Sequence, residues 1–238
     1  MHAGRRIIVA ASIAMLLLTV RAAFAAPAAP EEKEKERVLR RLDEAAKSFR
    51  STSADFEFDS VETDPIYEKN VQTGKVYFER QGKAFQTAAH IEKENGKPET
   101  KVYGVSGGVF KLFESGNLNQ VTTFSKASKI EGYLMLGFGA SGKELEEKWE
   151  IKYLGAETLD GVKTEKLELV AKDPEVRKNV SKVTAWIDPE RAVSLKLILN
   201  FSATEYKVCV YFNIKVNQPL PPDAFTLKTD KNTVFVPR

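Results

Sequence analysis

The sequence is poor in the residues that carry out most covalent and metal chemistry. It contains one cysteine, Cys209, and two histidines, His2 and His90. A single cysteine cannot form an internal disulfide, so the apolar core must stabilise the fold. The spacings H-E-x-x-H and C-x-x-C are absent, and His90 alone leaves no ligand set for a metal ion. We therefore expect no enzyme, no cofactor and no metal site, and a hydrolytic triad built on His90 is the alternative.

An excess of charge of one sign is also missing. The formal net charge of the chain is +3, and the three arginines among residues 1–25, which include no acidic residue, account for all of it. The remaining chain is neutral, and its acidic and basic residues are interspersed. Such a chain has no electrostatic footprint for nucleic acid or for an anionic membrane. Neither partner is expected.

Residues 1–25 have the pattern of a signal peptide. Arg5 and Arg6 precede an apolar run over residues 7–20, and Ala23-Phe24-Ala25 supplies the small residues of a cleavage site. The run is shorter than the roughly 20 residues of a membrane span. We therefore expect cleavage near Ala25 and a soluble protein in the periplasm, with an uncleaved anchor as the alternative. No cysteine follows the run, so the protein is not expected to be a lipoprotein itself.

Residues 26–37 are predicted to be an Ala/Pro tether followed by a charged helix start. After them, Val38, Leu42, Ala45 and Phe49 recur at the spacing of one helical face. A single amphipathic helix cannot bury its apolar face alone. We therefore expect this helix to lie against a sheet.

Residues 38–238 are predicted to form one domain, mainly of antiparallel strands. Phe56 and Phe58 alternate with acidic residues, which is the period-two pattern of a strand with one wet face and one dry face. Asn95-Gly96 is a strong hairpin signal, because both residues accept positive φ. About eleven such segments are spaced as in a barrel or sandwich, at residues 54–60, 70–80, 84–91, 100–105, 109–114, 119–124, 149–154, 162–171, 180–188, 193–201 and 205–217.

The excess of phenylalanine and valine on one strand face is the only indication of which face is concave. The last long strand alternates throughout, with Val208, Val210, Phe212, Ile214 and Val216 on one face and Lys207, Cys209, Tyr211, Asn213 and Lys215 on the other. After it, Phe225, Leu227 and residues 234–236 are expected to return and cover an edge of the sheet.

The segment Ile130 to Gly142 is the most apolar part of the chain after residue 25, and it fits neither a strand nor an amphipathic helix. Its four glycines make it pliable, and we interpret it as a movable apolar flap between two halves of the sheet. A buried connection that never moves is the alternative. Ser141 is expected to cap a short helix that ends at Lys148.

Arg80 shares a predicted strand face with Val76 and Phe78. This pattern predicts that Arg80 points to the apolar side of the sheet, where a guanidinium needs acceptors such as the carbonyl groups of a lid. The alternative is that Arg80, near the end of its strand, extends outward into solvent.

The order of these segments resembles the periplasmic outer-membrane lipoprotein carrier proteins, the LolA family. The resemblance covers nearly all of the chain after residue 25, and the order of its motifs is more specific than any one of them. The motifs are L-x-x-L-D-E-A-x-K-S-F-R-S at 39–51, S-A-D-F at 53–56, G-K-V-Y-F-E-R at 74–80, L-G-F-G at 136–139, K-L-E-L at 166–169, W-I-D at 186–188 and F-N-I-K-V-N-x-P-L-P-P-D-A-F at 212–225.

The resemblance implies a half-open, unclosed antiparallel β-barrel of about eleven strands, covered by an N-terminal helix and a central helical or loop lid. It implies a periplasmic chaperone that shuttles lipoproteins from an inner-membrane lipoprotein-releasing ABC transporter to an outer-membrane acceptor. In the family, an arginine of the second strand hydrogen-bonds the lid, and by position that residue is Arg80. Members often have proline next, whereas Gln81 follows here.

A carrier of this kind must cover its cargo. One acyl chain of about sixteen carbons would cost roughly 10 kcal/mol to leave in water, at about 0.8 kcal/mol per methylene. The expected lid and acyl-binding residues are Arg80 and the apolar side chains Phe56, Phe58, Val76, Phe78, Tyr133, Leu134, Met135, Leu136 and Phe138.

Two other functions remain open from the residues alone. The same fold can carry a free phospholipid or glycolipid, because an apolar cavity gives no information about the headgroup of its ligand. An envelope sensor or protein-interaction module is a different class, which usually has a second domain, and we see no linker to one after Asn217. We expect a monomer.

Overall fold

The computed structural model describes residues 30–82, 84–115, 118–124 and 136–237, which form three helices and twelve strands. The helices are α1 (Pro30–Ser48), α3 (Gly142–Lys148) and α4 (Pro174–Asn179). The strands are β1 (Ser51–Glu62), β2 (Glu68–Gln81), β3 (Ala84–Glu94), β4 (Lys97–Ser106), β5 (Val109–Glu114), β6 (Gln120–Phe124), β7 (Trp149–Leu159), β8 (Val162–Ala171), β9 (Lys182–Asp188), β10 (Val193–Asn200), β11 (Glu205–Val216) and β12 (Val234–Pro237).

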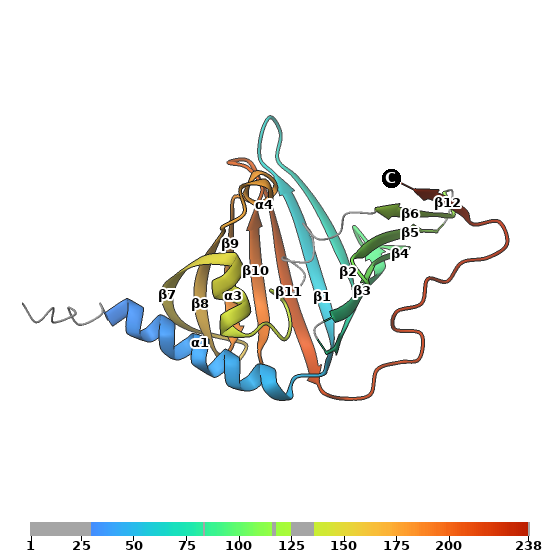
Figure 1. Ribbon diagram of the computed structural model, residues 1–238. Coiled ribbons are helices and arrows are strands. Elements are labelled where there is room, and N and C mark those ends of the chain that lie inside the picture. Colours follow the sequence, from blue (N-terminus) through green and yellow to red (C-terminus); the bar gives the residue numbers. More distant parts are fainter. Residues whose placement is uncertain (1–29, 83, 116–117, 125–135, 238) are drawn as a thin grey trace, which may run out of the picture.

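All twelve strands belong to one curved sheet, in the order β12-β6-β5-β4-β3-β2-β1-β11-β10-β9-β8-β7 (Figure 1). Within the described residues, every neighbouring pair is antiparallel except β12 and β6, which are parallel. The two edge strands, β7 and β12, do not pair with each other there, so the barrel is unclosed. The predicted fold class is confirmed, and β12 adds a twelfth strand to the eleven that alternation predicts.

Helix α1 covers one end of the concave face (Figure 1). Val38 and Leu42 are buried, as is Phe49 just beyond the helix, so the predicted apolar stripe is confirmed. The charged residues 31–37 are already helical, because α1 begins at Pro30, a residue that suits a first helical turn. Residues 1–29, with the predicted signal peptide and most of the tether, lie outside the described residues.

One hydrophobic cluster fills most of the concave side. It joins α1, α3 and the segment Leu136–Ala140 to side chains from β1, β2 and from β7 through β11. A strand exposes alternate residues to opposite faces, so a sheet with a dry concave face needs a cover of this kind. The predicted cover, an N-terminal helix with a central helical and loop lid, is the one observed.

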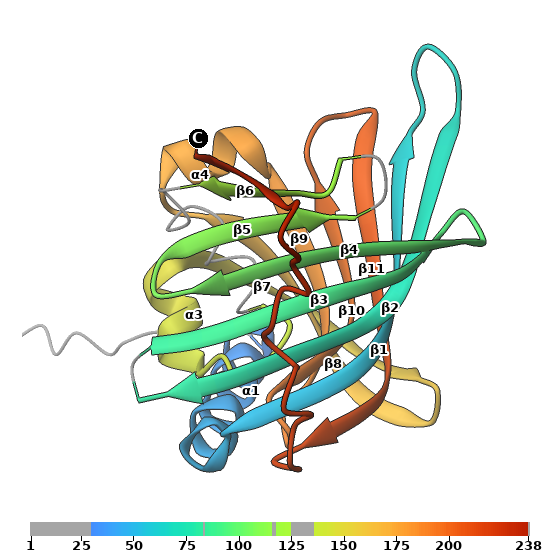
Figure 2. The same cartoon turned by 90° about the vertical axis from the view of Figure 1, so that its right-hand side faces the viewer.

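The C-terminal segment after β11 lies on the outer face of the sheet, where Figure 2 shows it crossing β3, β4 and β5. Phe225 and Leu227 pack there against a second, smaller cluster on β3 to β6, and His90 donates from Nε2 to the Ala224 carbonyl at 2.8 Å. The expectation that Phe225 and Leu227 cover an edge is therefore wrong, while β12 does cover the edge of β6.

The concave face of β11 is the opposite of the one that its valines indicate. Cys209 is buried on the concave side, whereas Phe212 is 43% exposed on the outer face. The alternation then breaks at a bulge where Asn213 adopts φ 51°, and Ile214 and Val216 pack against the concave-side cluster. A bulge inserts one residue and switches the faces of everything that follows.

The predicted turn at Asp173-Pro174 is a helix start. Asp173 caps α4, and its side chain accepts a hydrogen bond from the backbone N–H of Glu175. Asp before Pro is typical of turns, and it is equally typical of an N-cap followed by a first helical residue. The short α4 lies at the end of the strands opposite α1 (Figure 1).

Candidate functional site

The flap segment, defined here as Leu136–Ala140, is docked on the N-terminal end of β10. Ser194 donates from its backbone N–H to the Gly137 carbonyl at 2.8 Å and from Oγ to the Leu136 carbonyl at 2.6 Å. The Gly139 N–H donates to the Ala192 carbonyl at 2.7 Å. Phe138 forms an isolated antiparallel bridge with Val193. The segment therefore extends the sheet locally.

This docking edge is free because β11 leaves it. The pairing of β10 with β11 ends at Lys196 opposite Val210, shortly before the Asn213 bulge. Residues 193 and 194 then have β9 on one side only. Unpaired backbone groups of a strand edge readily accept another strand, and the flap segment takes this position.

Two glycines allow the flap segment and α3 to approach α1. A Cβ on Gly139 would lie 2.6 Å from the Phe49 ring, and the residue has φ +71°. A Cβ on Gly142 would lie 2.3 Å from the Leu39 carbonyl oxygen. Only glycine fits at both positions. The lid formed by the flap segment and α3 is thus closely packed on α1.

Helix α3 starts with a complete capping box, as Ser141 predicts. Ser141 Oγ accepts from the Glu144 N–H at 3.1 Å, and the Glu144 carboxylate accepts from the Ser141 N–H at 2.9 Å. In addition, the Lys143 N–H donates to Asp43 on α1 at 3.0 Å. Local chemistry therefore fixes α3, and one contact ties it to α1.

Arg80 joins β2 to this lid. Its Nη2 donates to the Gly139 carbonyl at 2.7 Å, and its Nη1 donates to Glu144 Oε1 at 3.0 Å. The side chain is 15% exposed, so it lies on the concave side as the strand pattern predicts, with a lid carbonyl as one acceptor. Glu144 is a further acceptor that the sequence did not indicate. We call this set of bonds the latch.

The latch also sets the charge of Glu144. Burial works to raise the pKa of this carboxyl group, but the hydrogen bonds from Arg80 and Ser141 outweigh burial and lower the pKa below its ordinary value. Glu144 is therefore ionised at neutral pH. Its carboxylate serves the α3 cap and the latch at once.

Beside the flap segment lies a cavity of about 230 Å³. Its walls come from β1 to β5, β10, β11 and Phe138, and most of them are apolar. The lining residues are Phe58, Val76, Thr87, Ala89, Tyr103, Val105, Phe110, Phe138, Leu197, Leu199, Lys207, Cys209 and Tyr211.

Burial keeps Cys209 and Tyr211, two titratable groups of the cavity wall, neutral at physiological pH. Burial raises the pKa of the Cys209 thiol to about 12. Burial also raises the pKa of the Tyr211 hydroxyl well above its ordinary value. A thiol in this state is a weak nucleophile. The chemistry of the walls therefore suits the binding of an apolar group rather than covalent catalysis.

The predicted apolar site residues that the structure describes lie at two depths. Phe58, Val76 and Phe138 line the cavity. Phe56, Phe78 and Leu136 are buried behind its walls, where Phe56 stacks on Phe58 at 3.9 Å between ring centroids. Tyr133, Leu134 and Met135 lie outside the described residues.

Most of the cavity wall was not among the predicted site residues. Tyr103, Phe110, Leu197, Leu199 and Tyr211 were all missed. The signal for Leu197 and Leu199 is the same period-two alternation that predicts β10. What was lacking was knowledge of which strand face is concave.

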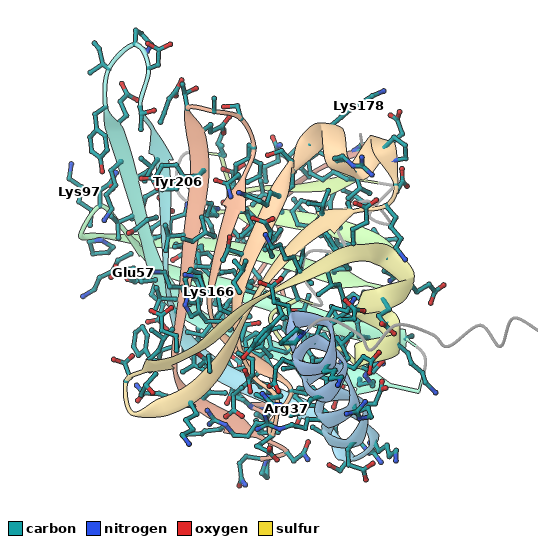
Figure 3. All side chains as sticks on the ribbon, turned by 90° about the vertical axis from the view of Figure 1, so that its left-hand side faces the viewer. Arg37, Glu57, Lys97, Lys166, Lys178 and Tyr206 are labelled. Carbon is teal, nitrogen blue, oxygen red and sulfur yellow. The ribbon has the colours of Figure 1, made fainter. Side chains whose placement is uncertain are left out.

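A second polar cluster fixes α1 to β8. Glu165 is 6% exposed, and its carboxylate accepts from Arg37 at 2.8 Å, from Arg41 at 2.9 Å and from the Tyr153 hydroxyl at 2.8 Å. Figure 3 shows Arg37 at the α1 end of the strands, opposite Lys178 on α4. Burial works to raise the pKa of Glu165, but its hydrogen bonds from Arg37 and Tyr153 lower it below its ordinary value.

Two glycine-rich segments match the sequence patterns of known functional motifs, but neither has the structural context that its motif requires. Residues 104–108 read G-x-S-x-G, but Ser106 is exposed at the hairpin between β4 and β5 rather than on a strand-to-helix elbow. Residues 137–142 read G-x-G-x-x-G, but they are buried against β10 instead of opening a βαβ unit. Among the described residues, no three His, Cys, Asp or Glu side chains are grouped to hold a metal ion.

In the part of the chain that the structure describes, no helix is long and apolar enough to cross a membrane. No protein-family model matches the chain. It is 32% identical over 108 residues to the uncharacterized protein MJ0687 of Methanocaldococcus jannaschii, a match that covers 45% of this chain and 29% of that protein.

Solved structures share the fold at low sequence identity. An uncharacterized conserved protein from Thermus thermophilus has a TM-score of 0.54 at 10% identity, covering 86% of this chain and 99% of that one. MucB has a TM-score of 0.50 at 13% identity, and the match covers 82% of this chain and 63% of that one. A putative outer membrane lipoprotein-sorting protein domain from Vibrio parahaemolyticus has a TM-score of 0.42 at 12% identity, and the match covers 82% of this chain and 97% of that one. The open half-barrel with a helical lid, which the resemblance to the LolA family implies, is therefore the fold of this chain.

Proposed function

We propose that this protein is a carrier that holds acyl chains in the half-barrel cavity and moves them through the periplasm. The observation that carries the proposal is the apolar cavity beside a lid that a few polar bonds hold in place. Apolar walls with few polar groups are typical of sites for apolar ligands. The neutral states of Cys209 and Tyr211 support binding rather than catalysis.

The lid supports a carrier because acyl chains must be covered during transfer. A diffusing protein could not leave a chain of about sixteen carbons in water at a cost of roughly 10 kcal/mol. The latch consists of one guanidinium, one carboxylate and one carbonyl. Such bonds exchange readily with water when the lid lifts, so cargo can be taken up and released without ATP bound to this chain.

Loading requires the lid to move. The cavity of about 230 Å³ is smaller than the roughly 300–1,000 Å³ of pockets that enclose a drug-sized ligand. We infer that the described state is the closed one, and that lifting the flap segment from β10 enlarges the cavity. The bonds that must break are those of Arg80 and those between the flap segment and residues 192–194.

Lipoproteins are the first cargo that we propose, on the strength of the motif resemblance and of the fold. In this proposal the signal peptide is cleaved near Ala25. The mature protein then receives the acylated N-terminus of a lipoprotein from an inner-membrane ABC transporter and delivers it to an outer-membrane acceptor. Arg80, Phe58, Val76 and Phe138 act in the site. Phe56, Phe78 and Leu136 support it from behind, and Tyr133, Leu134 and Met135 are proposed parts of the lid.

A free lipid is the second candidate cargo. The observation that favours it is Lys207 in the cavity wall, because its ammonium group attracts an anionic lipid headgroup. A neutral diacylglyceryl group offers no such partner.

The test is native mass spectrometry of the protein purified without detergent from a periplasmic extract. A bound mass that matches acylated peptides or intact lipoproteins supports the first cargo. A phospholipid or glycolipid mass supports the second. An empty protein that also fails to bind a fluorescent fatty acid would contradict the carrier function and favour an interaction module.

A further inference from the structure

Among the described residues that line the cavity, Lys207 is the one acidic or basic side chain. It lies on β11 directly opposite Ser60 of β1. Its Nζ is 5.5 Å from the centroid of the Phe58 ring, and the residue is half-buried.

Lys207 has no acidic partner, a property that it shares with Lys196 on the outer face but not with the basic side chains Arg80 and Lys101, which are also partly buried. Arg80 pairs with Glu144, and Lys101 pairs with Glu94 at 2.6 Å. Within the described ranges of the chain, Lys207 is in no ion pair. The face of the Phe58 ring attracts the ammonium group but does not neutralise it. A partly desolvated cation without a counter-charge is unfavourable, so an anionic ligand would find a prepared partner.

The location of Lys207 suits the headgroup end of a ligand. Cys209 and Tyr211 follow it along the concave face of β11, and the Tyr211 ring packs on the flap residue Phe138 at 5.0 Å between centroids. Lys207 also borders a polar surface groove beyond the cavity, where Lys69 is paired with Asp59 at 2.8 Å and the carboxylates of Glu62, Glu68 and Glu205 are exposed. These carboxylates repel an anion in the groove, so the place for an anion is the cavity side of Lys207.

We propose that Lys207 is a headgroup-binding residue and that the cavity selects an acyl chain with an anionic head, a carboxylate or a phosphate. The chain lies along Cys209 and Tyr211 toward the flap segment, and the head accepts a charge-assisted hydrogen bond from Nζ. The inference rests on the proposed acyl-carrier function, and it favours the second of the two cargoes, a free lipid, because the diacylglyceryl group of a lipoprotein is neutral.

The experiment compares two ligands with the same chain, palmitate and the neutral monopalmitoylglycerol, by isothermal titration calorimetry below their aggregation concentrations. The intact protein should bind palmitate about 10- to 100-fold more tightly, as expected for one hydrogen bond to a charged group. Lys207→Met should lose this preference and still bind monopalmitoylglycerol like the wild type, which also shows that the cavity is intact. Lys207→Arg should restore the preference.

The matched control is Lys196→Met. Lys196 lies on the outer face, 4.9 Å from the Trp186 ring, so its replacement should leave the preference unchanged. Palmitoyl lysophosphatidate in place of palmitate distinguishes the two anionic heads, and a Lys207-dependent preference for either one supports the proposal. No preference in the wild type, or an undiminished one in Lys207→Met, would overturn it. Failure of both palmitoyl ligands to bind at all would instead overturn the carrier function.

Discussion

The concave face of the sheet is divided into two wings that are filled in different ways. In the packed wing, β7 to β9, side chains such as Leu167, Val183 and Ala185 are completely buried, and both α1 and α3 contact β7. In the cavity wing, β1 to β5 with β10 and β11, half-buried side chains such as Tyr103 and Phe110 surround empty space. Both wings are parts of one continuous sheet.

The difference teaches how one fold separates stability from binding. In the packed wing, aliphatic side chains interdigitate at the packing density of an organic crystal, so removing a single methylene there lowers the stability of the fold. Large flat rings that meet across a curved sheet leave a void that a flexible ligand can enter. The covers differ in the same way, because α1 is fixed to the packed wing through the buried Glu165, whereas the flap segment is held over the cavity wing through the latch.

The largest effect that separates the wings is expected from shortening one leucine in each. Leu167→Ala removes a fully buried side chain of β8 in the packed wing and should lower the free energy of unfolding by about 2–5 kcal/mol. Leu199→Ala, at the half-buried cavity wall, should cost about 1 kcal/mol, because its site is already partly empty. Urea denaturation measures both. Equal losses would contradict the division into wings.

The next effect is expected from the reverse substitution, in which an alanine of each wing becomes leucine. Ala185→Leu overfills the packed wing and should cost about 1–3 kcal/mol of stability. Ala89 lines the cavity, so Ala89→Leu should leave the melting temperature nearly unchanged, while it weakens the binding of a fluorescent fatty acid. Thermal unfolding and probe titration of both variants check this. A stability loss in Ala89→Leu as large as in Ala185→Leu would show that the cavity is not available space.

A smaller effect is expected from Glu165→Gln, which removes the charge that Arg37 and Arg41 share. The loss should be about 1–2 kcal/mol at neutral pH, since both arginines are partly exposed. Glu190→Gln, at an exposed partner of Arg41, is the matched control and should have little effect.

The same cluster predicts how stability depends on pH. The pKa of Glu165 is lowered in the folded protein, so its contribution is complete above the ordinary glutamate pKa and is lost as the pH falls through the lowered value. Glu165→Gln should therefore be less sensitive to acid than the wild type in a series of urea denaturations. An identical slope of stability against pH in both proteins would remove Glu165 from the explanation.

The smallest effect on stability, about 1 kcal/mol, is expected from Arg80→Leu, because the latch lies between the lid and the cavity wing rather than in the packed core. Its effect should be kinetic, with faster uptake and release of a fluorescent fatty acid in stopped-flow measurements. Glu144→Gln keeps the capping box, since glutamine also serves in it, and should have the same kinetic effect in weaker form.

Arg40→Leu is the control for Arg80→Leu, because Arg40 is exposed on α1 and its replacement is expected to leave the rates unchanged. Normal ligand kinetics in Arg80→Leu would remove the latch from the proposed mechanism and leave the fold untouched.

Local patterns predicted much of the architecture. Alternation located eleven of the strands, and the bounds of β5 and β8 agree with it. Ser141 predicted the start of α3, because an N-cap depends only on residues that are neighbours in sequence. The Asn213 bulge was not predicted, since a positive φ at asparagine is one option among several and the surrounding pairing selects it.

The candidate site was predicted less completely than the fold. The inward direction of Arg80 follows from its strand face. Its partner Glu144 is 64 residues away in the sequence, and only the curvature of the sheet and the docking of the flap segment bring the two together. Lys207 was missed as a site residue, because its strand face reads as the more polar one.

The sequence by itself determined that the chain is mainly β, that a helix and an apolar flap must cover one dry face, and that its residues offer little for catalysis. These features depend on the period of apolar residues and on turn chemistry, which act over a few residues. Only the tertiary structure decided which wing is filled, which face of β11 is concave, and where the latch and the cavity lie. The physical reason is that packing and long-range pairing depend on the global twist of the sheet, and residues far apart in the chain set that twist together.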